Sequence, residues 1–313
     1  MSDERVIVIL NRTAGRGRAA RAEVALRSGL EAAGFAFEIR PTKCAGDGVR
    51  AARSALRSGA TAVVAAGGDG TVNEVVEGLH GQGAPPDAPA LAILPLGSGD
   101  DFAAAVGAPR DAVELVRAIR SGGRRRVDLG NVHWVDGSGG GRRVFCNGIG
   151  LGLEAEADLR AERLRFLRGL PLYATAVAWA LLRPPRPLLR LAWRSLDGPS
   201  EEERRRCLLV AVGNGHRAGG GFRINPGALP DDGLLDLCIV GARSRWASLR
   251  ALPGVLEGTH LSESGVRAAR CTDLEVESEE PFALHADGEV LARAATRVEV
   301  SVIPGALNLV ART

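Results

Sequence analysis

The residues best placed to do chemistry form a short glycine-rich turn, Gly67 to Thr71, with the sequence GGDGT. The turn follows the apolar run ATAVVAA and precedes the helix-like segment TVNEVVEGL, so the pattern predicts a link between a buried strand and a helix. Glycines there let backbone N–H groups approach phosphate oxygens, and a helix N-terminus favours negative charge. The carboxylate of Asp69 suits magnesium better than bare phosphate. An ordinary strand-to-helix turn is the plainer alternative.

A second turn of this kind runs from Pro95 to Phe102, again after an apolar strand-like run. Two such turns on one parallel sheet bring amides and carboxylates to its carboxyl edge, where α/β folds bind ligands. A simple helix N-cap by Ser98 or Asp100 is the alternative. The loop from Asn11 to Gly15, after the first strand, is a weaker signal for closure over a nucleotide. The chain has no G-x-x-x-x-G-K-[ST] motif, so a P-loop is disfavoured.

The elements that position these turns change in character along the chain. Strands alternate with helical stretches over the first third, which predicts a parallel sheet covered by helices. After DAVELVRAIRSG, consecutive strand patterns joined by DGSGGG indicate antiparallel β structure. We therefore expect a three-layer α/β domain over residues 1–127, with 305–313 packing back onto it. A mainly antiparallel β-sandwich domain should follow over 128–304, interrupted by one helical insertion at 154–182.

Composition agrees with two packed domains in a reducing compartment. The chain has 313 residues, 45% hydrophobic and 25% charged, with a net charge of +3. The five cysteines contain no C-x-x-C pair, and the N-terminus lacks the apolar region of a signal peptide, so we expect a cytoplasmic protein. The longest apolar run, Leu170 to Leu182, is shorter than the roughly 20 residues that span a bilayer. We expect no nucleic-acid partner.

The helical insertion alternates apolar and basic residues. This pattern is typical of a helix that contacts anionic lipid at the inner membrane face, and a buried helix covering the β domain is the alternative. The histidines are scattered without metal-ligand spacing, so packing or hydrogen-bonding roles are expected for His216 and His285. The apolar positions are Leu164, Leu167, Leu170, Leu172, Tyr173, Val177, Trp179, Leu181 and Leu182, and the arginines are Arg160, Arg163, Arg165, Arg168 and Arg183.

The order of motifs along the chain resembles that of bacterial diacylglycerol kinases, with sphingosine and ceramide kinases as relatives. The resemblance implies an ATP- and Mg2+-dependent lipid kinase that converts diacylglycerol to phosphatidic acid at a membrane surface, and it is compatible with a homodimer. NAD kinases and phosphofructokinases carry loops like GGDGT, but the later motifs favour the lipid branch. The motifs are GGDGTVNEV, PLGSGDDFA, VDLG at 127–130, NGIGLG, GNGHRAGGGFRINPGALPDDGLLDL and HADGE.

In that family the loops at the sheet edge hold ATP, and carboxylates organise magnesium. The resemblance implies a catalytic magnesium near Asp69, Asp101 and Asp128, and a structural magnesium at the DDG turn with Asp232 and the carbonyls of Leu229 and Leu234. It implies Glu289 of the DGE motif as the base, facing the ATP loops across a cleft, with Asp287 and Asp69 also in the catalytic set. The implied ATP-binding residues are Asn11, Arg12, Thr13, Ala14, Gly15, Thr42, Gly67, Gly68, Asp69, Gly70, Thr71, Asn73, Glu74, Ser98 and Asp101.

Two motifs depart from the family pattern. Arg12 replaces the usual proline, and Ser98-Gly99-Asp100-Asp101 stands for T-x-N-D, so that Asp100 adds a negative charge near the phosphates. Three hypotheses follow: a lipid kinase, a kinase for NAD or a small alcohol, and a nucleotide-binding regulator without catalysis. Retention of Asp69 and Glu289 argues against the third.

Overall fold

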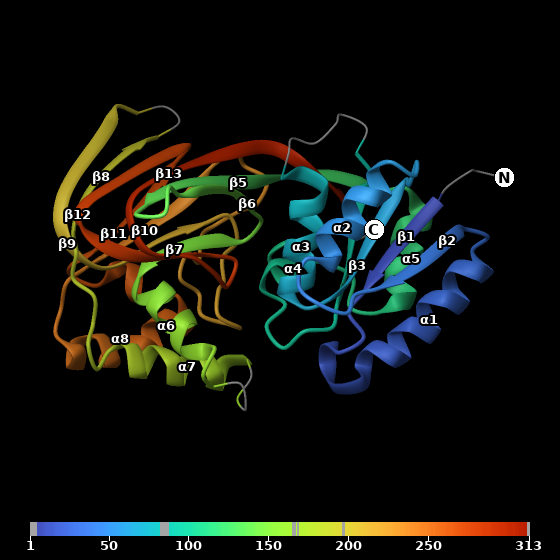
Figure 1. The fold of residues 1–313 in the computed structure, drawn as a ribbon, viewed down its shortest axis with the longest axis horizontal. Coiled ribbons are helices and arrows are strands. Elements are labelled where there is room, and N and C mark those ends of the chain that lie inside the picture. The colour runs from blue at the N-terminus through green and yellow to red at the C-terminus, as the bar shows by residue number, and fades with distance from the viewer. Residues whose placement is uncertain (1–4, 82–87, 165–166, 168, 196–197, 312–313) are drawn as a thin grey trace. The chain divides into compact units, whose positions relative to one another are not determined.

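The computed structural model describes residues 5–81, 88–164, 167, 169–195 and 198–311, and these form two compact units (Figure 1). The N-terminal unit comprises Met1–Val127 with Gly305–Thr313, and the C-terminal unit comprises Asp128–Pro304. The chain passes from one unit to the other within strand β5 (Arg124–Asp136) and returns within strand β13 (Glu289–Val310).

The N-terminal unit is built on a parallel sheet with the strand order β2-β1-β3-β4. The end of β13 adds to β4 in parallel, pairing Leu309 with Leu91. Strand β3 is buried along its whole length, as expected for a strand covered on both faces. The strands are β1 (Arg5–Leu10), β2 (Ala36–Pro41), β3 (Ala62–Gly67) and β4 (Ala90–Pro95).

Helices cover both faces of this sheet. Val6, Val8 and Leu10 share a core with α1 and α5, whereas Ile7 and Ile9 alternate to the other face and are equally buried. On that other face α2 packs against β1 and α3 packs against β3. The unit is therefore three-layered, as predicted. Its helices are η1 (Ala14–Gly17), α1 (Arg18–Ala32), α2 (Asp47–Leu56), α3 (Asp69–His80), α4 (Asp101–Ala105) and α5 (Ala112–Ser121).

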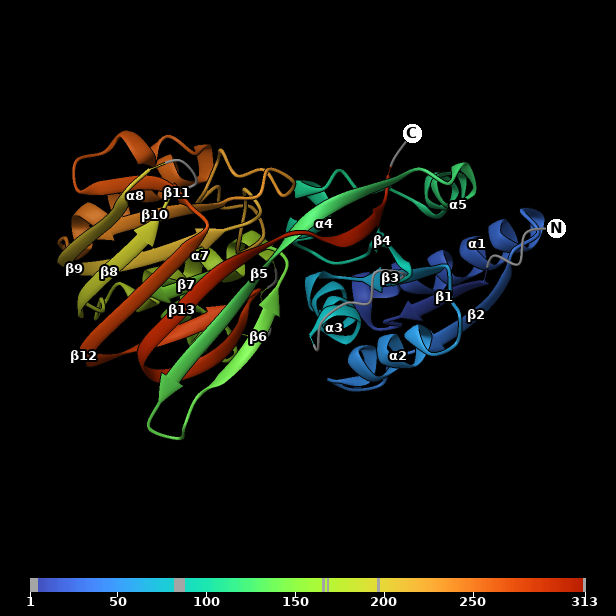
Figure 2. The ribbon, with the colours of Figure 1, turned by 90° about the horizontal axis from the view of Figure 1, so that it is seen from above.

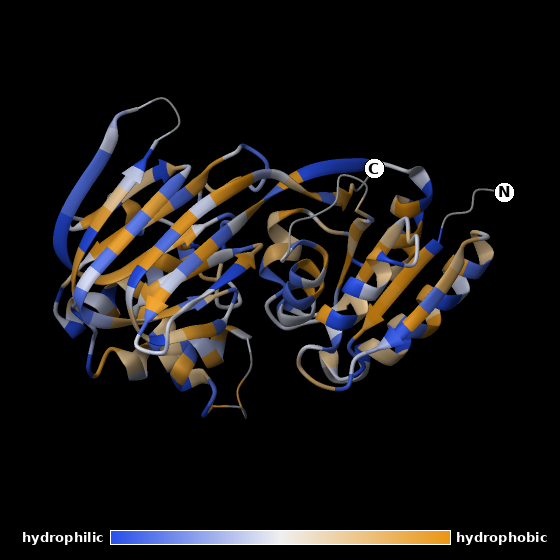
Figure 3. Ribbon diagram, turned by 45° about the horizontal axis from the view of Figure 1, so that its top comes forward, coloured by the Kyte–Doolittle hydropathy of each residue, from blue (hydrophilic) through white to orange (hydrophobic). Residues whose placement is uncertain are grey.

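The C-terminal unit is mainly antiparallel β structure with the strand order β11-β10-β9-β7-β12-β13. Strand β8 pairs with β9 and β12, and β5 pairs with β6 and β13, so that long strands lie side by side (Figure 2). Hydrophilic and hydrophobic residues alternate along them (Figure 3), and the hydrophobic faces enclose one core. The remaining strands are β6 (Gly141–Phe145), β7 (Gly148–Gly152), β8 (Leu188–Arg194), β9 (Ser200–Gly213), β10 (Leu235–Gly241), β11 (Val266–Cys271) and β12 (Asp273–Ala286).

The helical part of this unit differs from the expectation of one insertion. Two helices, α6 (Leu153–Ala161) and α7 (Gly169–Ala180), occupy the predicted region, and α8 (Arg245–Glu257) with the short turn η2 (His260–Ser262) lies outside it. Ala180 and Leu181 pack into a second core with residues of β9 and α8, so one side of α7 is buried. Arg165 and Arg168 lie outside the described residues. Of the helices described, none combines the length and the apolar character needed to cross a bilayer.

Candidate active site

The GGDGT turn links β3 to α3 as predicted, and its glycines are required by close packing. A Cβ atom on Gly67 would lie 2.2 Å from the hydroxyl oxygen of Thr71. A Cβ atom on Gly97, in the second turn, would lie 2.6 Å from the Cα of Gly68. The two turns therefore touch through glycine backbone. The N-cap of α3 is Gly68, which brings no side chain to the first-turn amides, and such amides are suited to phosphate.

Asp69 joins these two turns. One carboxylate oxygen accepts the N–H of Asp100 at 2.7 Å, and the other accepts the N–H of Asp101 at 2.7 Å. Phe102 N–H is 3.4 Å from the second oxygen. The side chain of Asp69 thus caps the start of α4 from a neighbouring loop and fixes the two turns at one edge of the sheet.

The carboxylate of Asp100 forms a hydrogen bond within its own turn. Asp100 adopts a left-handed backbone conformation with φ of 53°, which Asn and Asp tolerate best among non-glycine residues. Its carboxylate accepts the N–H of Gly97 at 2.9 Å within its own turn. Burial, with the nearby Asp69 carboxylate, raises the pKa of Asp100 to about 6. Near neutral pH a fraction of Asp100 is therefore protonated.

The first loop reaches the same edge of the sheet. The side-chain amide of Asn11 donates to the hydroxyl of Thr71 at 3.4 Å, and its carbonyl oxygen accepts the hydroxyl of Thr13 at 2.7 Å. Gly15 has φ of +66°, and a Cβ there would lie 2.5 Å from the carbonyl oxygen of Leu96. Thr42, after β2, donates its N–H to Leu10 at the end of β1. The structure therefore brings together Asn11, Thr13, Gly15, Thr42 and the two glycine turns.

Three residues assigned to ATP binding by resemblance have surroundings within the unit that the sequence did not indicate, and their assignment stays a prediction. Glu74 accepts the N–H groups of Gly46 and Gly48 at 2.7 and 2.8 Å, so its carboxylate caps the start of α2. Asn73 is fully buried in the first turns of α3. Arg12 pairs with Glu23 of α1 at 2.7 Å, so its guanidinium is held by α1. Ala14 begins η1, and Gly70 and Ser98 are exposed at the turns.

The carboxylates of the N-terminal unit fit a magnesium ion that is shared with phosphate oxygens. Asp69 and the buried Asp101 belong to adjoining turns, and the Asp69 oxygen that accepts only the N–H of Asp100 keeps a further lone pair. Magnesium commonly uses one or two carboxylates and completes its shell with water and substrate phosphates. Over the described part of the chain, no three His, Cys, Asp or Glu side chains gather into a metal site of their own. The two carboxylates, together with the phosphate oxygens of a bound triphosphate, would therefore supply the oxygen ligands that magnesium prefers.

In the C-terminal unit the DGE motif forms the turn between β12 and β13. Ala286 pairs with Glu289, and both intervening residues have positive φ, 47° at Asp287 and 80° at Gly288. This is the type I′ pattern that Asp-Gly favours. Glu289 is the first residue of β13, is 45% exposed, and pairs with Arg143 of β6 at 2.7 Å. The turn and the arginine together orient this carboxylate.

Asp287, which the resemblance places in the catalytic set beside Glu289, has its carboxylate bound by backbone amides. Its carboxylate accepts three backbone N–H groups, from Cys146 at 2.8 Å and from Asn147 and Gly148 at 2.9 Å each. Burial raises the pKa of Asp287, and the hydrogen bonds from these amides oppose the shift. Asp287 therefore ties the DGE turn to the link between β6 and β7.

Asp128 organises the DDG turn from the start of the unit. It is buried, its carboxylate accepts the N–H of Gly233 at 2.7 Å, and its own N–H donates to Pro230 at 2.6 Å. Asn214 donates to the carbonyl oxygens of Asp128 and Cys146. A role for Asp128 in holding magnesium stays a prediction.

The DDG turn does not fit the structural magnesium that the resemblance implies. One carboxylate oxygen of Asp232 accepts the N–H of Leu234 at 3.1 Å, and the other is paired with the guanidinium of Arg270. Arg270 also lies 3.7 Å from Asp236. A cationic side chain thus occupies the place at Asp232 where a metal ion would bind, and Leu229 is left 55% exposed.

A buried cluster that the sequence pattern did not indicate lies behind the DGE turn. His285 of β12 has its Nδ1 2.9 Å from Asp158 and its Nε2 3.8 Å from Glu154, both of α6. Burial alone would lower the pKa of His285, but Asp158 and Glu154 outweigh it and raise the pKa to about 10. The imidazolium therefore fastens α6 to the strand that leads into the DGE turn. Glu154 and Asp158 are four residues apart, so the helical periodicity of α6 places both on one face. The sequence does not indicate that His285 is their partner.

Comparison with known proteins assigns both parts of the chain. Residues 5–132 match the diacylglycerol kinase catalytic domain, and residues 147–311 match the YegS C-terminal NAD kinase beta sandwich-like domain. A protein of Chromohalobacter salexigens named "Probable lipid kinase YegS-like" is 38% identical over 286 residues, which cover 89% of this chain and 85% of that protein.

Solved structures share the fold. The crystal structure of a diacylglycerol kinase from Bacillus anthracis superposes with a TM-score of 0.71 at 21% identity, covering 99% of this chain and 97% of the other. Yeast NADH kinase complexed with NADH gives a TM-score of 0.57 at 13% identity, covering 100% and 85%. At these identities the likeness establishes the fold alone.

Proposed function

Because the chain belongs to the family of lipid kinases with a diacylglycerol kinase catalytic domain, we propose that it transfers the γ-phosphoryl group of ATP to a lipid hydroxyl, with diacylglycerol as the acceptor. The observation that carries this proposal is the convergence of three loops at the carboxyl edge of one parallel sheet. They are 11–15, 67–71 and 96–101, and Asp69 fastens the second to the third.

We assign binding of the phosphoryl donor, ATP, to the N-terminal unit. Phosphoryl transfer depends on positioning and on neutralising charge more than on covalent catalysis. The amides at the start of α3 and the exposed hydroxyl of Ser98 supply hydrogen bonds to phosphate oxygens, and Asp69 with Asp101 would hold magnesium. Bound magnesium would neutralise part of the phosphate charge.

The C-terminal unit is assigned the base. Glu289 takes the proton from the acceptor hydroxyl as its oxygen bonds to phosphorus and the bond to ADP breaks. Arg143 and the rigid turn hold its carboxylate in one orientation, so little reorganisation is needed at the moment of transfer.

An NAD-type acceptor is the second candidate, because the fold is shared with an NADH kinase. The test is a panel of acceptors with γ-labelled ATP and magnesium, using mixed micelles that contain diacylglycerol, ceramide or sphingosine, and NAD or glycerol in solution. We expect label on diacylglycerol. Label on NAD alone would replace the lipid proposal with the NAD proposal, and label on no acceptor would favour a regulator without catalysis.

The role of Glu289 as the base is tested with Glu289→Gln, which should lower the rate of transfer. Its matched control changes another carboxylate on the same strand. Glu299→Gln removes a charge from β13 at a site paired with Arg297, and it should keep the wild-type rate. Loss of transfer in Glu299→Gln equal to that in Glu289→Gln would show that the rate reports the integrity of β13 and not a base.

A further inference from the structure

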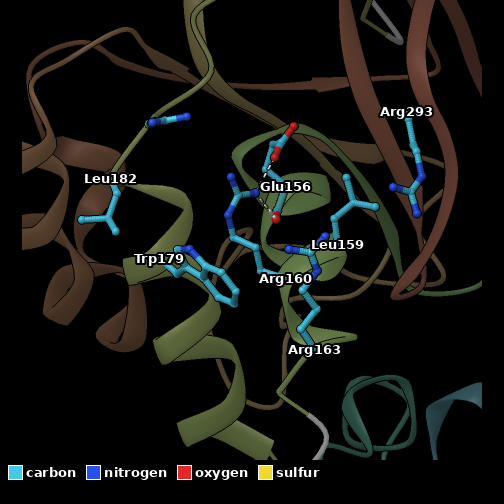
Figure 4. A pocket seen from close by; sticks show the side chains of 8 residues that line it. Glu156, Leu159, Arg160, Arg163, Trp179, Leu182 and Arg293 are labelled. Carbon is cyan, nitrogen blue, oxygen red and sulfur yellow. Dashed lines mark hydrogen bonds and ion pairs between the residues drawn. The ribbon is translucent and has the colours of Figure 1, made fainter.

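A cavity of about 490 Å³ lies in the C-terminal unit, lined by residues of α6 and α7, of the segments that directly follow these helices, and of β13. Figure 4 shows Arg160 of α6, Arg163 just after α6, Trp179 of α7 and Arg293 of β13 around it. Its volume is within the range of small-molecule sites, which is larger than a single ion requires. The other lining residues are Glu156, Leu159, Leu182 and Arg183.

The charge around this cavity is strongly positive. Four arginines face one acid, and Glu156 is already paired with Arg160. Within the described ranges, no carboxylate lies at ion-pair distance from Arg163, Arg183 or Arg293. Three guanidinium groups without an internal counter-ion in one concave site favour an external anion, and the arginine fork binds phosphate oxygens well.

The rim of the cavity is apolar, which a site for a purely soluble anion does not require. Among the lining residues, Trp179 is 38% exposed and Leu182 is 63% exposed. An exposed tryptophan beside arginines is typical of surfaces at the interface between water and lipid. The pairing of guanidinium groups with exposed apolar side chains matches a ligand that has a phosphate next to hydrocarbon.

The wall of the cavity is fixed before any ligand arrives. The face of α6 that carries Glu154 and Asp158 is clamped to His285, while other α6 side chains line the cavity. At the C-terminal end of α7, Ala180 and the following Leu181 are packed in the core. Because both helices are anchored, binding does not have to order them.

We propose that this cavity binds the phosphate headgroup of an anionic phospholipid, with Arg163, Arg183 and Arg293 on the phosphate and Trp179 and Leu182 against the acyl region. The site anchors the C-terminal unit to an anionic membrane surface. The proposal does not depend on the kinase activity, because binding can be measured without ATP.

The test is co-sedimentation of the full chain with vesicles of phosphatidylcholine alone and of phosphatidylcholine containing phosphatidylglycerol. We expect at least tenfold tighter binding to the anionic vesicles. The double variant Arg163→Gln/Arg293→Gln should lose at least tenfold of that affinity at unchanged melting temperature. The control Arg117→Gln/Arg204→Gln removes the same charge from exposed positions on α5 and β9 and should retain the affinity.

Two further arms separate the sources of phosphate. Trp179→Gln should weaken vesicle binding but leave binding of soluble glycerol phosphate unchanged. Equal losses in the cavity and control variants would reduce the effect to diffuse charge, and binding of inorganic phosphate or glycerol phosphate without any preference for anionic vesicles would make this a soluble-anion site. Either result would overturn the proposal.

Discussion

Asp69 connects the two glycine turns in addition to being a candidate metal ligand. Its two oxygens accept amides from Asp100 and Asp101, and a substitution there disturbs the second turn as well as any bound cation. The rate lost in Asp69→Ala therefore combines loop geometry with metal binding. Glu289 offers the cleaner test, because its contact within the unit is with the side chain of Arg143.

We expect Glu289→Gln to lower kcat at least about a hundredfold, the range typical of a general base. The substitution keeps size and leaves the backbone of the turn intact, so the melting temperature should stay close to that of the wild type. Steady-state kinetics on labelled acceptor measures the loss. A folded variant that turned over at the wild-type rate would remove Glu289 from the mechanism.

Asp100 gives a prediction that concerns stability. Its folded-state pKa of about 6 exceeds the unfolded value of about 4, so the folded protein binds more protons and loses stability as pH rises from 4 to 6. Asp100→Asn keeps an acceptor for Gly97 and removes the charge beside Asp69. After allowance for solvent screening, the gain should be about 1–2 kcal/mol at pH 8 and none near pH 4. Urea unfolding at pH 4 and pH 8 measures the difference in the free energy of unfolding between variant and wild type. An equal difference at both pH values would contradict the raised pKa of Asp100 as the cause.

At the scale of elements, the DDG turn is held by Arg270 where a metal was expected. We predict that EDTA leaves the melting temperature unchanged, whereas Arg270→Gln lowers stability by about 1 kcal/mol, because Asp232 loses its counter-ion. Arg194→Gln breaks a more exposed pair with Asp273 and serves as the control. A fall in melting temperature on chelation would restore the structural metal.

The anchor of α6 on β12 predicts a second pH effect. Because the folded-state pKa of His285 is raised to about 10, its stabilisation is complete below the unfolded value of about 6.5 and is lost as pH rises toward 10. His285→Gln should cost about 3–5 kcal/mol at pH 6, since Asp158 is left buried without its partner. Thermal unfolding from pH 6 to pH 10 should show a shallower decline of the melting temperature in the variant than in the wild type. The control is His133→Gln, which changes an exposed histidine of β5. Parallel pH curves for variant and wild type would refute the charged clamp.

Local patterns were predictable from the sequence, and long-range partners were not. The apolar runs and glycines around 62–71 predict strand, turn and helix correctly, and Asp287-Gly288 forms the turn type that the Asp-Gly pair favours. The partners of Asp287 lie about 140 residues away at Cys146 to Gly148, and no periodicity encodes such a pairing. Helix α8 was missed because Pro253 and Gly254 interrupt its pattern.

At the scale of the whole chain, the two units divide the proposed chemistry. The N-terminal unit gathers turns suited to phosphate, and the C-terminal unit presents a carboxylate on a rigid turn and an arginine-lined cavity. In the N-terminal unit, the sequence signal for the site is the spacing of glycines. In the C-terminal unit, the charged residues are scattered along the sequence and come together only in the folded chain.

The central claim is that the three loops of the N-terminal unit grip the phosphates of a nucleotide. A crystal structure with magnesium and a non-hydrolysable ATP analogue tests it most directly. The account predicts phosphate oxygens within hydrogen-bond distance of the backbone amides at residues 68–71, with the metal beside Asp69. A triphosphate bound elsewhere on the protein, with these amides facing only water, would contradict it.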